Sequence, residues 1–146
     1  MSDAAFMSKA LELARAQKGR TGENPSVGCV IVKKGIIVGQ GVTSDGGRPH
    51  GETNALQIAG QQARDADVYV TLEPCSHYGQ TAPCASALVQ AGIKRCIIAV
   101  IDPDPRVHWR GAALLQEAGI DTIIGLGSDE ARAINADFFA RIKARH

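Results

Sequence analysis

The second half of the chain constrains the fold most strongly, because short β-branched apolar segments alternate there with helical ones. Residues 67–72 (DVYVTL), 95–101 (RCIIAVI) and 121–126 (DTIIGL) are predicted strands. Segments 84–92, 110–118 and 128–145 show helical spacing. Strands separated by helices favour parallel pairing, since a parallel connection must cross over the sheet. The sequence therefore predicts an α/β protein with helices on both faces of a sheet.

The first half adds a helix, a hairpin and a second helix. Residues 3–18 have helical spacing and end before the break at Asn24-Pro25. Segments 27–32 (VGCVIV) and 36–42 (IIVGQGV) flank a short turn and predict an antiparallel hairpin. Helical spacing returns over residues 51–63.

Several helix ends carry recognisable signals. Gly92 is expected to end the helix over 84–92. Ser128 is expected to cap the closing helix over 128–145. The basic residues Arg141, Lys143 and Arg145 on that helix are predicted to face solvent, where they complement the helix dipole.

Composition narrows the possible classes of protein. The 146 residues suffice for one domain with a buried core, predicted to span 1–146. Because 16 basic residues face 15 acidic ones and aromatic residues make up 4%, binding to nucleic acid is not expected. No apolar run approaches the roughly 20 residues of a membrane span, and the N-terminus lacks a secretory pattern. We therefore expect a cytoplasmic protein without membrane association, whose four cysteines are thiols.

Three short segments carry the residue types of a catalytic metal site: His50-Gly51-Glu52, Pro74-Cys75 and Cys84. Each of these residues alone is more often an ordinary loop or core side chain. Together, one imidazole and two thiolates form a ligand set typical of catalytic zinc, which leaves a fourth position for water. Zinc acidifies that water, and Glu52 is placed to accept the proton without binding the metal. The zinc deaminases have this arrangement, His-x-Glu followed by Pro-Cys-x-x-Cys.

The spacing of the two cysteines departs from that pattern. Eight residues separate Cys75 from Cys84, where two are usual, so the intervening loop must fold back to the metal. Cys29 and Cys96 lie within apolar strands and are expected in the core. Cys84 starts a predicted helix, whose N-terminal dipole stabilises a thiolate. It is therefore the best candidate for the second cysteine ligand of the metal.

The stretch TLEPCSHYGQTAPC, residues 71–84, resembles the deaminase domain of bacterial riboflavin-biosynthesis proteins. The resemblance runs from the first helix to the last and includes Asn24-Pro25, His50-Gly51-Glu52 and Asp102-Pro103. It implies a cytidine deaminase-like fold, three-layer α/β/α with a central mixed five-stranded sheet. It also implies hydrolytic deamination of a diamino-ribosylamino-pyrimidinone 5′-phosphate to the corresponding aminouracil.

The same resemblance implies roles for particular residues. His50, Cys75 and Cys84 would bind Zn²⁺, and Glu52 would be the catalytic proton shuttle. The substrate would be bound by Asn24, His77, Gln80, Thr81, Asp102 and Asp104. Two of these depart from the usual family residues, because Gln80 stands where Lys or Arg is usual and Asp104 where Asn is frequent.

Other readings of the sequence stay open. The neutral Gln80 suits a deaminase of another base or nucleoside, such as guanine, cytosine, cytidine, or a base in tRNA or single-stranded DNA. A zinc-stabilised binding domain is a further possibility, although a purely structural zinc site prefers four protein ligands. The resemblance also suggests a homo-oligomer, a dimer or tetramer, and either a free-standing deaminase or one cut from a deaminase–reductase. Trp109 fits either an anchor for a partner subunit or a lid over the pocket.

Overall fold

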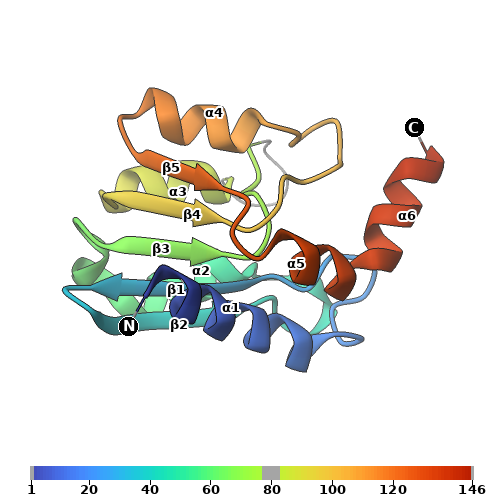
Figure 1. Cartoon of the computed structure of the whole chain (residues 1–146), viewed down its shortest axis with the longest axis horizontal. Coiled ribbons are helices and arrows are strands. Elements are labelled where there is room, and N and C mark those ends of the chain that lie inside the picture. The colour runs from blue at the N-terminus through green and yellow to red at the C-terminus, as the bar shows by residue number, and fades with distance from the viewer. Residues whose placement is uncertain (1, 77–82, 146) are drawn as a thin grey trace.

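A five-stranded mixed sheet organises the chain, and the computed structural model describes residues 2–76 and 83–145 (Figure 1). β1 pairs antiparallel with both β2 and β3, whereas β3, β4 and β5 run parallel. The predicted hairpin and the mixed sheet are therefore confirmed. In sheet order the strands are β2 (Ile36–Val42), β1 (Gly28–Lys33), β3 (Asp67–Val70), β4 (Arg95–Ile98) and β5 (Asp121–Ile124).

Helices cover both faces of this sheet, which confirms the three-layer architecture (Figure 1). One face carries α1 (Asp3–Gln17) and α5 (Ser128–Ile134). The other carries α2 (Gly51–Ala59), α3 (Cys84–Ala91) and α4 (Arg110–Glu117). The last helix, α6 (Ala136–Arg145), extends beyond the end of the sheet where β3 and β4 finish (Figure 1). Two short 3₁₀ helices flank α2: η1 (Asp45–Gly47) precedes it and η2 (Gly60–Ala63) follows it.

The core lies around β1, β3 and β4, whose β-branched side chains are buried from both sides. Cys29 and Cys96 are fully buried there, as their apolar surroundings predict. At the edge of the sheet, β5 leaves Ile123 40% exposed. In the described residues, no helix is both long and apolar enough to cross a membrane.

Two expectations about the closing helix are wrong. The segment 128–145 forms two helices, because Asn135 leaves the helical conformation between α5 and α6. The residue that caps α5 is Gly127, with a positive φ of 80° and no side-chain cap bond, so Ser128 is already the first helical residue. Gly92 ends α3 in the left-handed conformation, as predicted.

Candidate active site

The N-termini of α2 and α3 meet beyond the carboxyl end of β3, and this junction gathers the predicted metal-binding residues. His50 immediately precedes α2, Cys84 is the first residue of α3, and Cys75 lies in the loop after β3. Ligand sites of α/β proteins commonly lie at the carboxyl ends of parallel strands. Here the two helix starts also direct backbone N–H groups toward the same place.

His50, Cys75 and Cys84 form a group that could hold a metal ion. Their ligand atoms all lie within 4.8 Å of one another, and Sγ of Cys84 is 3.5 Å from Nδ1 of His50. Within the described part of the chain, no fourth His, Cys, Asp or Glu side chain joins the group. One nitrogen and two sulfur donors at this spacing fit a zinc ion with an open fourth position.

The protonation of the two thiols also suits a metal site. The backbone N–H of Cys84 donates to Sγ of Cys75 at 3.2 Å. The hydrogen bond from the side chain of Cys84, followed by that from His50, lowers the pKa of Cys75 to about 4. The same pairing, together with burial, raises the pKa of Cys84. The pairing thus favours the thiolate form of Cys75, and a metal that binds both sulfurs would displace the remaining proton.

Glu52 lies in the first turn of α2 and is 4% exposed. Burial raises the pKa of its carboxyl group to about 7. A group with a pKa near the surrounding pH can both accept and donate a proton, so this value suits a general acid–base at neutral pH. The intervening Gly51 is required for close packing, because a Cβ there would lie 2.4 Å from the carbonyl oxygen of Val27. Gly51 thus lets α2 begin against the backbone of Val27, just before β1.

A cavity of about 250 Å³ adjoins these residues. Its lining brings His50, Glu52 and Cys75 together with three predicted substrate-binding residues, Asn24, Asp102 and Asp104. Two arginines, Arg48 and Arg106, also line it. The other predicted substrate-binding residues, His77, Gln80 and Thr81, lie outside the described residues.

The loop after β4 forms one wall of the cavity through two successive turns. The Asp102 carboxylate accepts the N–H of Asp104 at 2.9 Å, and the Asp104 carboxylate accepts the N–H of Arg106 at 3.0 Å. Arg106 also pairs with Asp104 through its guanidinium at 2.7 Å, which balances the charge that an aspartate adds at this position. Burial raises the pKa of Asp102 to about 7.

Glu73 is a site residue that the sequence analysis missed. Its buried carboxylate accepts the N–H groups of Asp102 at 3.2 Å, Trp109 at 3.1 Å and Ala112 at 2.9 Å. It therefore joins the wall of the cavity to the start of α4. Gly111 permits this docking, since a Cβ there would lie 1.8 Å from the carbonyl oxygen of Pro74. Two features of the sequence could have indicated this role: Glu73 directly follows an apolar strand, and the Arg110-Gly111 pair stands at the start of the helix that it caps.

Comparison with known proteins places this geometry in a family. Residues 1–100 match the family described as the cytidine and deoxycytidylate deaminase zinc-binding region, and the chain belongs to that class of zinc-binding deaminases. Within this class it belongs to the family of the riboflavin-biosynthesis deaminases. It is 46% identical over 143 residues to the diaminohydroxyphosphoribosylamino-pyrimidine deaminase of Buchnera aphidicola subsp. Acyrthosiphon pisum, covering 98% of this chain and 97% of that protein.

Longer relatives show the same likeness. The chain is 48% identical over 143 residues to the riboflavin biosynthesis protein RibD of Escherichia coli. The aligned region is 98% of this chain but only 39% of that longer protein. The match to RibD of Aquifex aeolicus is 47% over 140 residues, or 96% of this chain and 39% of the relative. The structure of Acinetobacter baumannii RibD superposes with a TM-score of 0.91 at 45% identity, over 96% of this chain and 40% of that one. The resemblance seen in the sequence is thus confirmed, and zinc is the metal of this family.

Proposed function

We propose that this chain hydrolyses the amino group of a diamino-ribosylamino-pyrimidinone 5′-phosphate to give the aminouracil derivative and ammonia. One observation carries the proposal: a possible metal site and the buried carboxyl of Glu52 adjoin a single cavity. The names of the relatives, a diaminohydroxyphosphoribosylamino-pyrimidine deaminase and riboflavin biosynthesis proteins, supply the substrate. The proposal treats residues 1–146 as a single deaminase domain.

In the proposed mechanism, His50, Cys75 and Cys84 hold the zinc ion. Zinc, when bound, acidifies water, so that an oxygen nucleophile is available at neutral pH. Glu52 accepts the proton of the attacking water while the new C–O bond forms at the ring carbon that bears the amino group. Glu52 passes this proton to the ring nitrogen, then takes the remaining proton of the new hydroxyl group and passes it to the amine. The C–N bond breaks, a carbonyl group forms at the ring carbon, and ammonia leaves. The raised pKa of Glu52 suits a group that must both accept and return a proton.

The rest of the cavity would bind the pyrimidine and its ribose phosphate. Asn24 and Asp102 offer polar groups to the ring and the sugar. Arg48 gives the cavity a cationic group that suits a phosphate, whereas the charge of Arg106 is balanced by Asp104. By family resemblance, His77, Gln80, Thr81 and Asp104 would also line the ribose-phosphate end.

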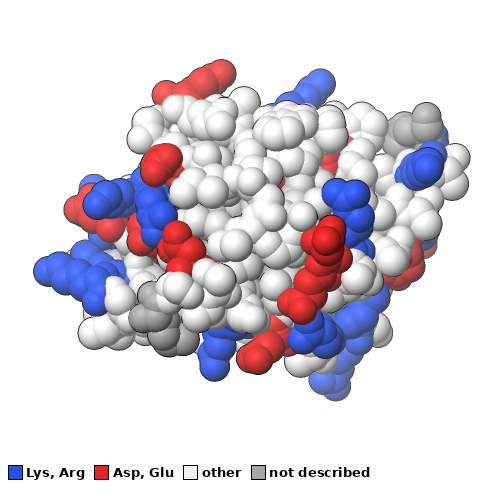
Figure 2. Space-filling model, viewed as in Figure 1, with Lys and Arg blue, Asp and Glu red and all other residues white. Residues whose placement is uncertain are grey.

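A deaminase of another base is the second candidate, and Gln80 is the residue that favours it. A polynucleotide substrate is the less supported form of this alternative. On the face shown in Figure 2, basic and acidic residues are interspersed rather than gathered into a basic groove. The three-ligand group likewise favours a catalytic zinc over a structural one.

A cytoplasmic location and a homo-oligomer stay predictions. Trp109 is 51% exposed and Ile123 is 40% exposed, and an oligomer that buries them would remove apolar surface from water. Sedimentation equilibrium of the chain and of a Trp109→Ser variant measures the mass directly. A monomeric wild-type chain at tens of micromolar would contradict the prediction.

The substrate is tested by ammonia release from the zinc-loaded protein. The pyrimidinone phosphate, its dephosphorylated form, guanine, cytosine and cytidine are compared at equal concentration. Turnover mainly of the phosphate is expected. Preferential turnover of a free base or nucleoside would replace the proposed substrate and leave the deaminase chemistry in place.

A further inference from the structure

We propose that Asn135, at the break between α5 and α6, is a positioning residue for substrate binding. It holds the loop of residues 21–27, which brings Asn24 and Pro25 to the cavity. The inference rests on the proposed function, because it assigns this loop a role in binding the pyrimidine substrate.

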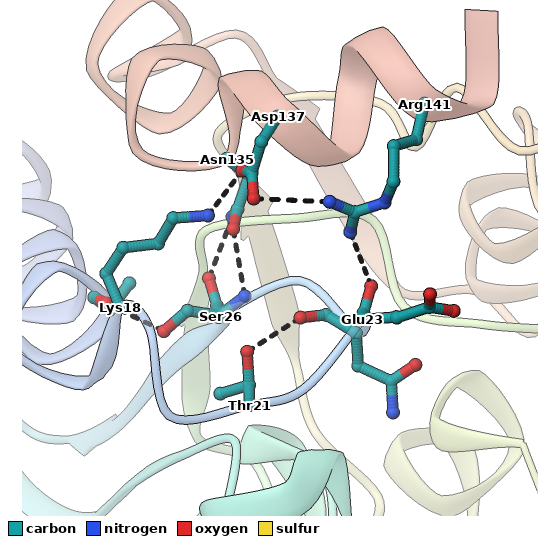
Figure 3. A network of polar contacts seen from close by, with 9 residues as sticks. Lys18, Thr21, Glu23, Ser26, Asn135, Asp137 and Arg141 are labelled. Atoms are coloured by element: carbon teal, nitrogen blue, oxygen red, sulfur yellow. Dashed lines mark hydrogen bonds and ion pairs between the residues drawn. The ribbon is translucent and has the colours of Figure 1, made fainter. Parts of the chain in front are cut away.

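The contact between Asn135 and Ser26 is reciprocal and buried (Figure 3). Oδ1 of Asn135 accepts the backbone N–H of Ser26 at 2.9 Å, and Nδ2 donates to the carbonyl oxygen of Ser26 at 2.8 Å. Asn135 is 3% exposed and Ser26 is fully buried. Without the amide, both backbone groups of Ser26 would lack these partners in the interior, which costs free energy unless the loop moves toward water.

A second contact from α6 reinforces the first. The Arg141 guanidinium donates to the carbonyl oxygen of Glu23 at 2.7 Å and pairs with Asp137 at 3.3 Å (Figure 3). Asp137 also pairs with Lys18, just beyond the C-terminus of α1. Arg141 therefore binds the protein's own loop, contrary to the expectation that it simply faces solvent. The two helices at the end of the chain fix the loop at Glu23 and at Ser26.

The loop is short, with Thr21 and Asn24 bonded to each other inside it and Asn24 and Ser26 bonded to neighbouring segments. Thr21 donates through its hydroxyl to the carbonyl oxygen of Asn24 at 2.7 Å, and the side chain of Asn24 donates to the carbonyl oxygen of Gly47 at 3.1 Å. Ser26 donates through its hydroxyl to the carbonyl oxygen of Ala14 at 2.7 Å. Because only Pro25 separates Asn24 from Ser26, a shift of Ser26 would change the position of Asn24.

The cavity lining places these contacts beside the substrate site. Asn24, Pro25 and Val27 of the loop line the cavity, and so does Phe138 of α6. The proposed metal ligands come from the start of α2, the start of α3 and the loop after β3. Because these are separate elements, loss of the Asn135 amide should weaken substrate binding and leave zinc in place.

The test compares Asn135→Leu, which keeps the side-chain size and removes both hydrogen bonds, with Asp67→Asn as a control. Asp67 pairs with Arg95 at the start of β3, at the opposite end of that strand from Cys75. For Asn135→Leu we expect KM to rise about tenfold, with kcat within about twofold, since uniform substrate binding is lost. Zinc content should stay unchanged, and the amide of Ser26 should exchange its hydrogen faster. The control should lower the Tm without changing KM.

An unchanged KM in folded Asn135→Leu, or an equal KM rise in the control, would overturn the proposal. If Asn135→Leu does not fold, Arg141→Met removes only the outer contact and should raise KM about threefold; an unchanged KM there would also overturn it. No ammonia from the unaltered protein with any pyrimidine phosphate would contradict the proposed function itself, and the substrate role of Asn135 with it. A normal rate of the unaltered protein together with an unchanged KM of Asn135→Leu would instead contradict only the role of Asn135.

Discussion

The backbone N–H of Cys84 donates to Sγ of Cys75 at 3.2 Å, although eight residues separate the two cysteines. The next N–H, of Ala85, donates to the carbonyl oxygen of Cys75 at 3.0 Å. The start of α3 is therefore bonded directly to the residue that follows Pro74. The two cysteines thus lie close together in spite of their longer separation in the sequence, as a Cys-x-x-Cys turn achieves locally.

This relationship predicts that Cys84 is needed for zinc binding in spite of the unusual spacing. Cys84→Ala removes one of three protein ligands, so bound zinc should fall from about one ion per chain to a small fraction of that. Cys96→Ala is the matched control, since that thiol is buried in β4 away from the group. Metal analysis of both purified variants measures the difference. Full zinc retention by Cys84→Ala would show that another residue is the ligand.

Glu73→Gln should weaken both the fold and substrate turnover while zinc stays bound. The carboxylate accepts three backbone N–H groups, and an amide turns one oxygen into a donor that opposes an N–H. We expect a loss of about 1–3 kcal/mol in the free energy of unfolding, the cost of an unsatisfied buried group. Urea unfolding and kcat/KM measure the two effects. A variant with unchanged stability would contradict the role of Glu73 at the start of α4.

Asp102→Asn should change the stability in a pH-dependent way. Burial raises the folded-state pKa of Asp102 to about 7 from an ordinary value near 3.8, so keeping this carboxylate ionised opposes folding. The cost is absent below about pH 4, grows between pH 4 and 7, and is complete above pH 7. Asparagine keeps an oxygen that can accept the N–H of Asp104 and carries no charge.

The variant should therefore gain more Tm, relative to wild type, at pH 8 than at pH 5. The two Tm differences should differ by about 5–10 °C. The cost of ionising Asp102 rises by about 2–3 kcal/mol between pH 5 and pH 8, and each kcal/mol corresponds to roughly 3 °C in a chain of this size. Thermal unfolding of both proteins at the two pH values measures it. An equal Tm difference at pH 5 and pH 8 would show that the pKa of the Asp102 carboxyl group is not raised in the folded state.

The sequence predicts the sheet and the metal group because both depend on local pattern. The β-branched runs indicate the central strands, and one imidazole with two thiol side chains indicates zinc as the metal. The positions of Glu73 and Asn135 cannot be read in that way. Asn135 pairs with a residue 109 positions earlier, and Glu73 caps a helix 39 positions later. Their roles exist only once α4, α5 and α6 are packed.

The error at Asn135 has the same origin. The helical spacing of 128–145 continues through this residue, so that a single helix is the natural prediction. The reciprocal hydrogen bonds to the buried backbone of Ser26 accompany a non-helical conformation, with φ of −111° and ψ of 33°. A tertiary contact here overrides the local pattern.

The most direct test of the account is ammonia release by zinc-loaded Glu52→Gln with the pyrimidinone phosphate, measured beside the unaltered protein at equal zinc content. Glutamine keeps the size of the side chain and cannot accept and return a proton. The account predicts full zinc binding and a rate lower by about 10²–10⁴-fold, the typical contribution of a general acid–base. Turnover close to wild type with zinc bound would contradict the role of Glu52 and, with it, the mechanism proposed for this site.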